Sequence, residues 1–148
     1  MLQTKLNIFL WIIFSAVACD TLEPNRINND STELVEVIIK NDWPNDEINF
    51  NSVTLNGDNL NANLSYSGGC KTHKFVLVIS TAFEKSNPPQ TEMFLSHENN
   101  NDNCEAYLSE EIKFDLSGLK EVYIKRYGRP GTIILKLLDY GNFTYSFH

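Results

Sequence analysis

The stretch HKFVLVISTAF, residues 73–83, decides the fold class of this chain. Side chains alternate between the two faces of a β-strand, so Phe75, Leu77 and Ile79 share one face and the two intervening valines share the other. A strand that is apolar on both faces is typical of a position inside a sheet. The stretch therefore predicts a β-rich domain with a central strand here.

Shorter segments with a similar pattern lie on both sides of this strand. Residues 60–66 alternate, with Leu60, Leu64 and Tyr66 on one face, and the turn sequence Asn56-Gly57-Asp58-Asn59 precedes them. About seven or eight short strands with turn signals between them predict a mainly β fold, an antiparallel β-sandwich. The other predicted strands cover residues 34–40, 52–55, 91–97, 106–116, 131–138 and 143–147.

One short helix is predicted near residues 118–127. Ser117 is a good N-cap residue, and Gly128 is a natural C-terminal stop. Leu119 and Tyr123 recur at helical spacing and define one apolar face. We expect this helix to cover an end or a corner of the sandwich.

The N-terminus has the pattern of an export signal. Lys5 is the only charge before Asp20, residues 8–14 are apolar, and the segment Ala16-Val17-Ala18-Cys19 resembles the lipobox of bacterial lipoproteins. The apolar run is well below the roughly 20 residues that span a bilayer. The favoured interpretation is a signal peptide over residues 1–18 and a lipid on Cys19, although an uncleaved anchor and an ordinary secretory signal are alternatives.

Cleavage before Cys19 leaves 130 of the 148 residues and changes the formal charge from -7 to -8, because Lys5 is removed. Residues 19–32 are polar and form a predicted lipidated tether, and residues 33–148 form one domain. An acidic chain without a basic cluster argues against nucleic acid as a partner and against docking on anionic lipid by charge. The lipid would provide the membrane attachment. These features place the protein in the bacterial cell envelope, facing the periplasm or the cell exterior.

With Cys19 set aside, two cysteines remain. Exported thiols usually oxidise, so Cys70 and Cys104 are predicted to form a disulfide. The alternative is a zinc site in which these two cysteines combine with His73 and His97. The histidines could also bind a metal weakly without the thiols, or simply form hydrogen bonds to backbone carbonyls.

A second candidate cation site lies in the Asn-rich segment 98–102. Glu98, Asn100 and Asp102 place oxygen ligands at positions one, three and five, as many calcium loops begin. Position six is Asn103 instead of glycine, and position twelve is Ser109 instead of an acid. The commoner explanation of such a segment is a hairpin tip rich in turn residues.

Three segments together resemble a recurring set of uncharacterised bacterial lipoproteins of the Bacteroidetes type. They are Gly68-Gly69-Cys70-Lys71-Thr72-His73 with the phenylalanine two residues later, the segment from His97 to Ala106, and the segment 114–119. The resemblance covers roughly residues 66–135 and departs from the pattern at Glu98, where an aspartate is usual. It implies an envelope lipoprotein and no particular activity.

No catalytic motif stands out in the sequence. A nucleophile elbow, a Gly-rich phosphate loop and a His-Glu-x-x-His helix are all missing. The sequence favours a non-enzymatic, lipid-anchored module without a cofactor, with a structural role or with an unknown protein or glycan as its ligand. The alternative is a zinc- or calcium-dependent module, with or without enzyme activity, centred on His73 and His97.

Overall fold

The computed structural model describes residues 32–35 and 43–148 of the chain. The predicted signal peptide, Cys19, nearly all of the tether and most of the predicted strand 34–40 lie outside the described residues. Within the described ranges, no helix combines the length and the apolar character needed to cross a membrane.

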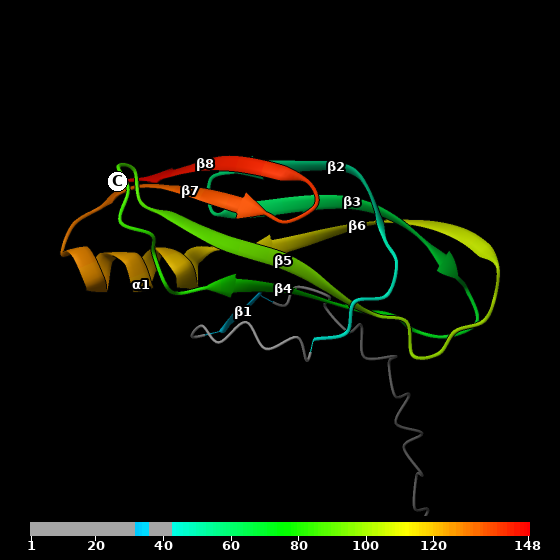
Figure 1. Cartoon of the computed structure of the whole chain (residues 1–148). Coiled ribbons are helices and arrows are strands. Elements are labelled where there is room, and N and C mark those ends of the chain that lie inside the picture. The colour runs from blue at the N-terminus through cyan, green and yellow to red at the C-terminus, as the bar shows by residue number, and fades with distance from the viewer. Residues whose placement is uncertain (1–31, 36–42) are drawn as a thin grey trace, which may run out of the picture.

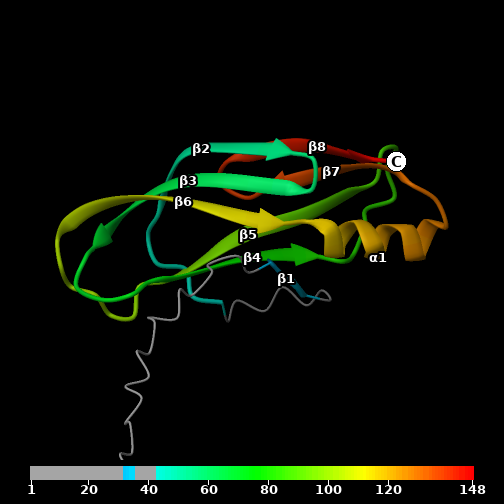
Figure 2. The ribbon, with the colours of Figure 1, turned by 180° about the vertical axis from the view of Figure 1, so that it is seen from behind.

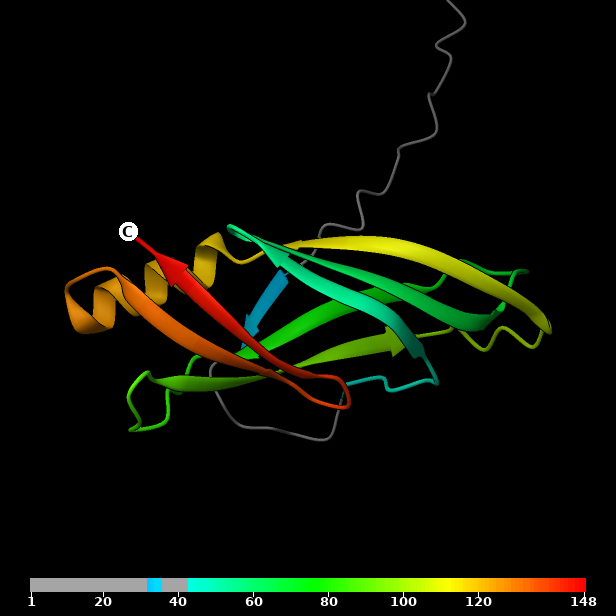
Figure 3. The same ribbon diagram turned by 90° about the horizontal axis from the view of Figure 1, so that it is seen from above.

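In the described ranges, eight strands form two sheets that pack face to face, and one helix lies at the end where the C-terminus is (Figure 1). The five-stranded sheet has the order β1-β4-β5-β7-β8, and the three-stranded sheet has the order β2-β3-β6. Views from behind and from above show the same two layers (Figures 2 and 3). The mainly β sandwich with one helix is thus confirmed. The elements are β1 (Thr32–Val35), β2 (Asn49–Asn56), β3 (Asn59–Gly68), β4 (Lys74–Ser80), β5 (Gln90–Glu98), β6 (Ala106–Asp115), α1 (Ser117–Tyr127), β7 (Gly131–Leu137) and β8 (Gly141–Phe147).

The central strand predicted from the sequence is β4, which lies between β1 and β5. Its side chains Phe75, Leu77 and Ile79 belong to the hydrophobic core between the sheets. The two valines on the opposite face are also buried. From the other sheet, β3 contributes the predicted face, including Leu60 and Leu64. Each sheet therefore buries the face that its alternation indicated.

The five-stranded sheet is mixed, whereas the sequence pattern suggested antiparallel pairing throughout. β4–β5 and β7–β8 are antiparallel, but β1–β4 and β5–β7 are parallel. After β5 the chain crosses to the other sheet as β6 and passes through α1 before it returns as β7. This long crossover brings β7 back in the direction of β5, which a hairpin connection could not do.

The start of α1 differs from the prediction in its cap. Ser117 is the first helical residue, and Leu116 occupies the N-cap position without a side-chain cap hydrogen bond. Instead, the Asp115 carboxylate accepts a hydrogen bond of 2.9 Å from the Ser117 N–H. The prediction of Ser117 as the N-cap was therefore wrong, because the fully buried Leu116 continues the inward face of β6 up to the helix. The predicted stop is correct, since Gly128 has a left-handed conformation with φ of 70°.

Candidate functional site

The disulfide between Cys70 and Cys104 lies just beyond the end of the β3–β6 ladder. The last pair of that ladder is Gly68 with Ala106, and the two cysteine Cα atoms are 5.9 Å apart. The two sulfurs lie near the Asp102 carboxylate, within the spacing of a metal site. Sulfurs joined in a disulfide are not thiolates. The predicted zinc site of Cys70, His73, His97 and Cys104 therefore lacks two of its four ligands.

His73 and His97 lie together, as the metal interpretation required, but they bind each other. The Nδ1 atom of His73 is 2.9 Å from Nε2 of His97. The Nε2 atom of His73 is 3.3 Å from the Asp102 carboxylate, and the Nδ1 atom of His97 is 3.2 Å from the Asp46 carbonyl oxygen. Both histidines are buried, with 5% and 1% of their surface exposed. All four ring nitrogens therefore have protein partners, and solvent has little access to them.

Asp102 holds the loops that carry the two cysteines. Its Oδ2 atom accepts hydrogen bonds from the N–H groups of Cys70 and Lys71 at 2.9 and 2.8 Å, and its Oδ1 atom accepts one from Cys104 at 3.0 Å. The backbone N–H of Cys104 is the largest influence that holds the pKa of Asp102 below its ordinary value, although burial of the carboxylate opposes it. The carboxylate is thus directed at the chain's own N–H groups, away from the exposed tip.

The exposed tip of the candidate calcium loop binds a positive charge from the protein itself. The Lys71 ammonium donates hydrogen bonds to the backbone oxygens of Asn100 and Asn101 at 3.0 and 2.8 Å. Both asparagines have φ of 55°, which asparagine tolerates well. The Asn100 side chain also donates to the Thr72 oxygen at 2.5 Å. These contacts are those of an Asn-rich hairpin tip docked on the neighbouring loop.

The partners of the histidine pair determine how many hydrogens the two rings must carry. The Asp102 carboxylate and the Asp46 carbonyl only accept hydrogen bonds, so the ring nitrogen facing each of them must carry a hydrogen. The contact between the rings needs a third hydrogen, whereas two neutral imidazoles carry only two. Burial lowers the pKa of His97, and the charge of His73 lowers it further, against the Asp46 backbone contact, which raises it. Two neutral rings therefore leave one of the three contacts without a hydrogen.

Aromatic rings surround the histidine pair. Phe75 stacks on His97 with a centroid distance of 4.6 Å, and the Tyr66 centroid is 4.7 Å from that of His73. The Tyr66 hydroxyl donates a hydrogen bond of 2.8 Å to Glu110, the residue that interrupts the apolar pattern of β6. Burial, followed by the contact with Glu110, raises the pKa of Tyr66 to about 12. The polar groups on this side of the core are therefore paired with one another.

Gly68 makes room for this network. A Cβ atom at this position would lie 2.6 Å from two ring atoms of His73 and 3.1 Å from the Asp102 carboxylate. No real side chain tolerates contacts of 2.6 Å without displacement of its neighbours. The first glycine of the Gly-Gly-Cys segment thus has a steric role.

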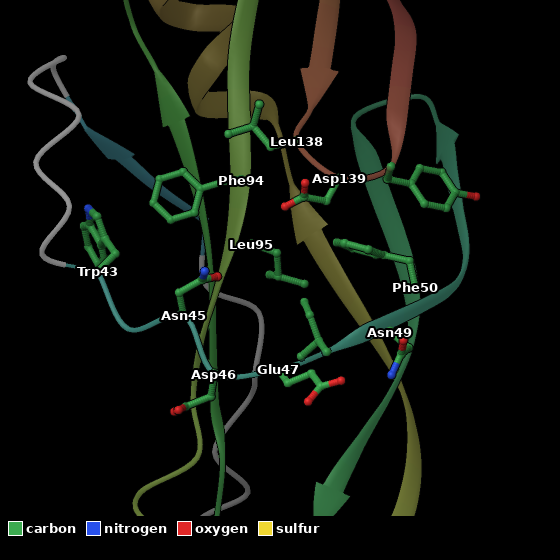
Figure 4. Close-up of a pocket in the computed structure, with 12 residues that line it drawn as sticks. Trp43, Asn45, Asp46, Glu47, Asn49, Phe50, Phe94, Leu95, Leu138 and Asp139 are labelled. Atoms are coloured by element: carbon green, nitrogen blue, oxygen red, sulfur yellow. The ribbon is translucent and has the colours of Figure 1, made fainter.

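An open pocket of about 820 Å³ lies beside this network and shares Asp46 with it (Figure 4). It is formed by the segment that enters β2, the middle of β5 and the turn between β7 and β8. Sequence reasoning missed it because its walls come from three separate segments, each unremarkable alone. The lining residues are Trp43, Asn45, Asp46, Glu47, Ile48, Asn49, Phe50, Phe94, Leu95, Leu138, Asp139 and Tyr140.

Aromatic and aliphatic side chains in the pocket are open to solvent. Tyr140 and Leu138 are 42% and 45% exposed, unusual values for large apolar side chains in this domain. The Tyr140 ring packs against Phe50 at a centroid distance of 5.4 Å, and its hydroxyl accepts a hydrogen bond of 2.9 Å from the Val53 N–H. These two contacts fix the orientation of the Tyr140 ring.

The pocket is also acidic. Three of its lining residues, Asp46, Glu47 and Asp139, carry carboxylates, and none of the twelve described lining residues is basic. The ion pairs found among residues 32–35 and 43–148 involve other carboxylates. Asp46 accepts a hydrogen bond of 2.7 Å from the Asn99 N–H, which connects the pocket to the loop of the histidine network.

No protein-family model matches the sequence, and no curated protein shows significant similarity to it. Among solved structures, the fold is similar to a NigD-like immunity protein from Bacteroides caccae, with a TM-score of 0.58 and 19% identity over 77% of this chain. The chain spans 57% of the length of that protein. A "Putative lipoprotein" from Bacteroides fragilis gives a TM-score of 0.51 and 12% identity, with 80% of this chain and 69% of that one covered. At these identities the likeness establishes the fold, and both neighbours come from Bacteroides.

Proposed function

We propose that this chain is a lipid-anchored protein of the bacterial cell envelope that acts by binding a partner. The observation that carries the proposal is the contrast between two regions. The histidines and Asp102, the residues most suited to chemistry, are buried and bonded to each other. The solvent-accessible pocket offers aromatic rings, carboxylates and amides, which suit recognition.

The composition of the pocket favours binding over catalysis. Its twelve described lining residues include no serine, cysteine, histidine or lysine. The lining therefore offers no aliphatic hydroxyl, thiol or amine as a nucleophile, and the hydroxyl of Tyr140 is engaged by the Val53 N–H. The metal-dependent alternative centred on His73 and His97 has no contact in its favour, since their ring nitrogens are engaged within the protein.

The lipid anchor is supported by Ala16-Val17-Ala18-Cys19 after a short apolar run. The neighbour described as a "Putative lipoprotein" is consistent with an envelope location. The fold shared with the neighbour described as an immunity protein is compatible with a protein partner. Neither likeness goes beyond the fold by itself, so anchoring and binding each need a direct experiment.

Anchoring is tested by metabolic labelling with a radioactive fatty acid. We expect the wild-type protein to be labelled and the Cys19→Ser variant to be unlabelled and either unprocessed or soluble. The double variant Cys70→Ala/Cys104→Ala is the matched control, because it also removes cysteines but keeps the lipid site. Labelling that persists in Cys19→Ser would contradict the anchor.

Binding is tested by photo-crosslinking in intact cells. A photoreactive amino acid replaces Leu138, which lines the pocket, or Tyr107, which is 67% exposed and does not line it. We expect a discrete adduct from position 138 and none from position 107. Equal adducts at the two positions, or none at either, would contradict the assignment of the pocket as the binding site.

A further inference from the structure

We propose that the pocket receives an extended basic segment of a protein partner, with an arginine or lysine side chain held between the aromatic rings and the carboxylates. This inference rests on the proposed binding function and specifies its ligand. Three independent features of the pocket support it: its uncompensated negative charge, its aromatic walls, and a gap in strand pairing on β5.

The negative charge of the pocket favours a cationic ligand. Glu47 and Asp139 contribute two negative charges to the pocket, Asp46 adds a third carboxylate that already accepts the Asn99 N–H, and no described lining residue is basic. Like charges gathered in a partly enclosed site repel one another, and a bound guanidinium or ammonium group relieves that repulsion. An anionic ligand would add to the repulsion.

The aromatic rings suit the same cation. In Figure 4 the ring of Phe50 points from β2 into the pocket, where the carboxylates of Glu47 and Asp139 lie, whereas the ring of Phe94 points from β5 toward Trp43. Trp43 and Tyr140 add two further rings to the lining. An arginine side chain stacks on such rings and forms hydrogen bonds with a carboxylate at the same time.

The pairing of β5 argues for a peptide. β7 pairs with β5 up to Met93, where the Leu138 N–H donates to the Met93 oxygen at 3.0 Å. The segment before β2 pairs with β5 at His97, whose N–H donates to the Pro44 oxygen at 3.2 Å. Leu95 lies between these two points, and no described strand faces it on this side.

Alternation along a strand fixes the direction of the Leu95 main-chain groups. Its N–H and C=O point to the same side as those of Met93 and His97, and Leu95 lines the pocket. An extended peptide supplies a C=O and an N–H at the spacing that such a gap requires. The pocket volume of about 820 Å³ lies within the usual range for ligand sites. A neutral glycan could stack on the aromatic rings, but it would not neutralise the carboxylates of the pocket.

The test uses the mature lipoprotein in detergent and the fluorescence of Trp43, which is the only tryptophan after residues 1–18 are removed. The probe is the capped peptide Gly-Val-Arg-Val-Gly. Its matched control replaces arginine by citrulline, which has the same shape and no charge. We expect the arginine peptide to bind at least about tenfold more tightly than the citrulline peptide, with affinity that falls as salt is added.

Protein variants separate charge from general damage. The double variant Glu47→Gln/Asp139→Asn should weaken binding of the arginine peptide about tenfold, and asparagine keeps the left-handed turn at position 139. Glu111→Gln removes an exposed carboxylate outside the pocket and should have no effect. Methylation of the amide nitrogen of the residue after arginine should also weaken binding, because it removes a main-chain donor.

Equal binding of the arginine and citrulline peptides, or unchanged affinity in the double variant, would overturn the inference. So would a fluorescence change with the neutral trisaccharide maltotriose in the absence of peptide binding. The crosslinking experiment at Leu138 distinguishes this failure from that of the proposed function. An adduct at that position, together with no peptide binding, would leave a binding site whose ligand has a different chemistry.

Discussion

Replacement of both Cys70 and Cys104 by alanine removes the disulfide and little else. The backbone N–H groups of the two residues, which donate to Asp102, remain in the variant. The loss of stability in this variant therefore measures the crosslink and not the hydrogen bonds around it.

The magnitude follows from the separation of the cysteines. They are 34 positions apart, so the disulfide closes a loop of this length in the unfolded chain. The chain-entropy model gives about 4 kcal/mol for such a loop at 25 °C. For a domain of this size, 1 kcal/mol corresponds to roughly 4 °C, so the melting temperature should fall by about 15 °C.

The assay is thermal unfolding of the mature protein, followed by near-ultraviolet circular dichroism. Wild-type protein in reducing buffer is the control and should melt close to the double alanine variant. A variant that melts within about 3 °C of the oxidised wild type would refute the reasoning, because the loop would then be constrained in the unfolded state by other means.

Three further outcomes are expected. Gly68→Ala should lower the free energy of unfolding by about 2–3 kcal/mol, because its Cβ would overlap the His73 ring. Gly57→Ala is the control: its Cβ would enter open space, but its φ of 58° disfavours alanine, so the variant should lose only about 1 kcal/mol. Urea titration measures the free energy of unfolding of both variants. Tyr145→Phe removes a hydrogen bond of 2.8 Å to Asp58 and should cost about 1 kcal/mol. Because that contact is the largest influence that lowers the pKa of Asp58, wild-type stability should fall as the pH drops below about 4, and it should fall less steeply in the variant. Since the pKa of Tyr66 is raised to about 12, wild-type stability should decline from about pH 10 to that value, and Tyr66→Phe should flatten the decline in alkaline denaturation.

The sequence predicts the parts of this fold that depend on local pattern. The two apolar faces of β4, the alternation of β3 and the glycine stop of α1 all follow from side-chain periodicity and backbone conformation. The parallel pairing of β5 with β7 does not, since it depends on a crossover through the second sheet. The cap of α1 was misassigned because burial of Leu116 outweighs the capping preference of Ser117.

For the candidate site, the sequence identifies residues but not their contacts. The sequence identifies His73, His97 and Asp102 as candidate metal ligands. In the structure, their side chains contact one another instead. Lys71 carries no signal in the sequence that would place its ammonium on the tip of the Asn-rich loop. The pocket joins residues near positions 43–50, 94–95 and 138–140, so only the tertiary structure reveals it.

The hydroxyl of Tyr140 has a consequence for self-association. β2 is an edge strand of the three-stranded sheet, and open strand edges are the usual templates for aggregation between copies of a chain. By accepting the Val53 N–H, the hydroxyl occupies a main-chain donor that an incoming strand would need. The Tyr140 side chain, from the turn between β7 and β8, thus blocks one pairing position on this edge. The net negative charge of the chain adds electrostatic repulsion between copies.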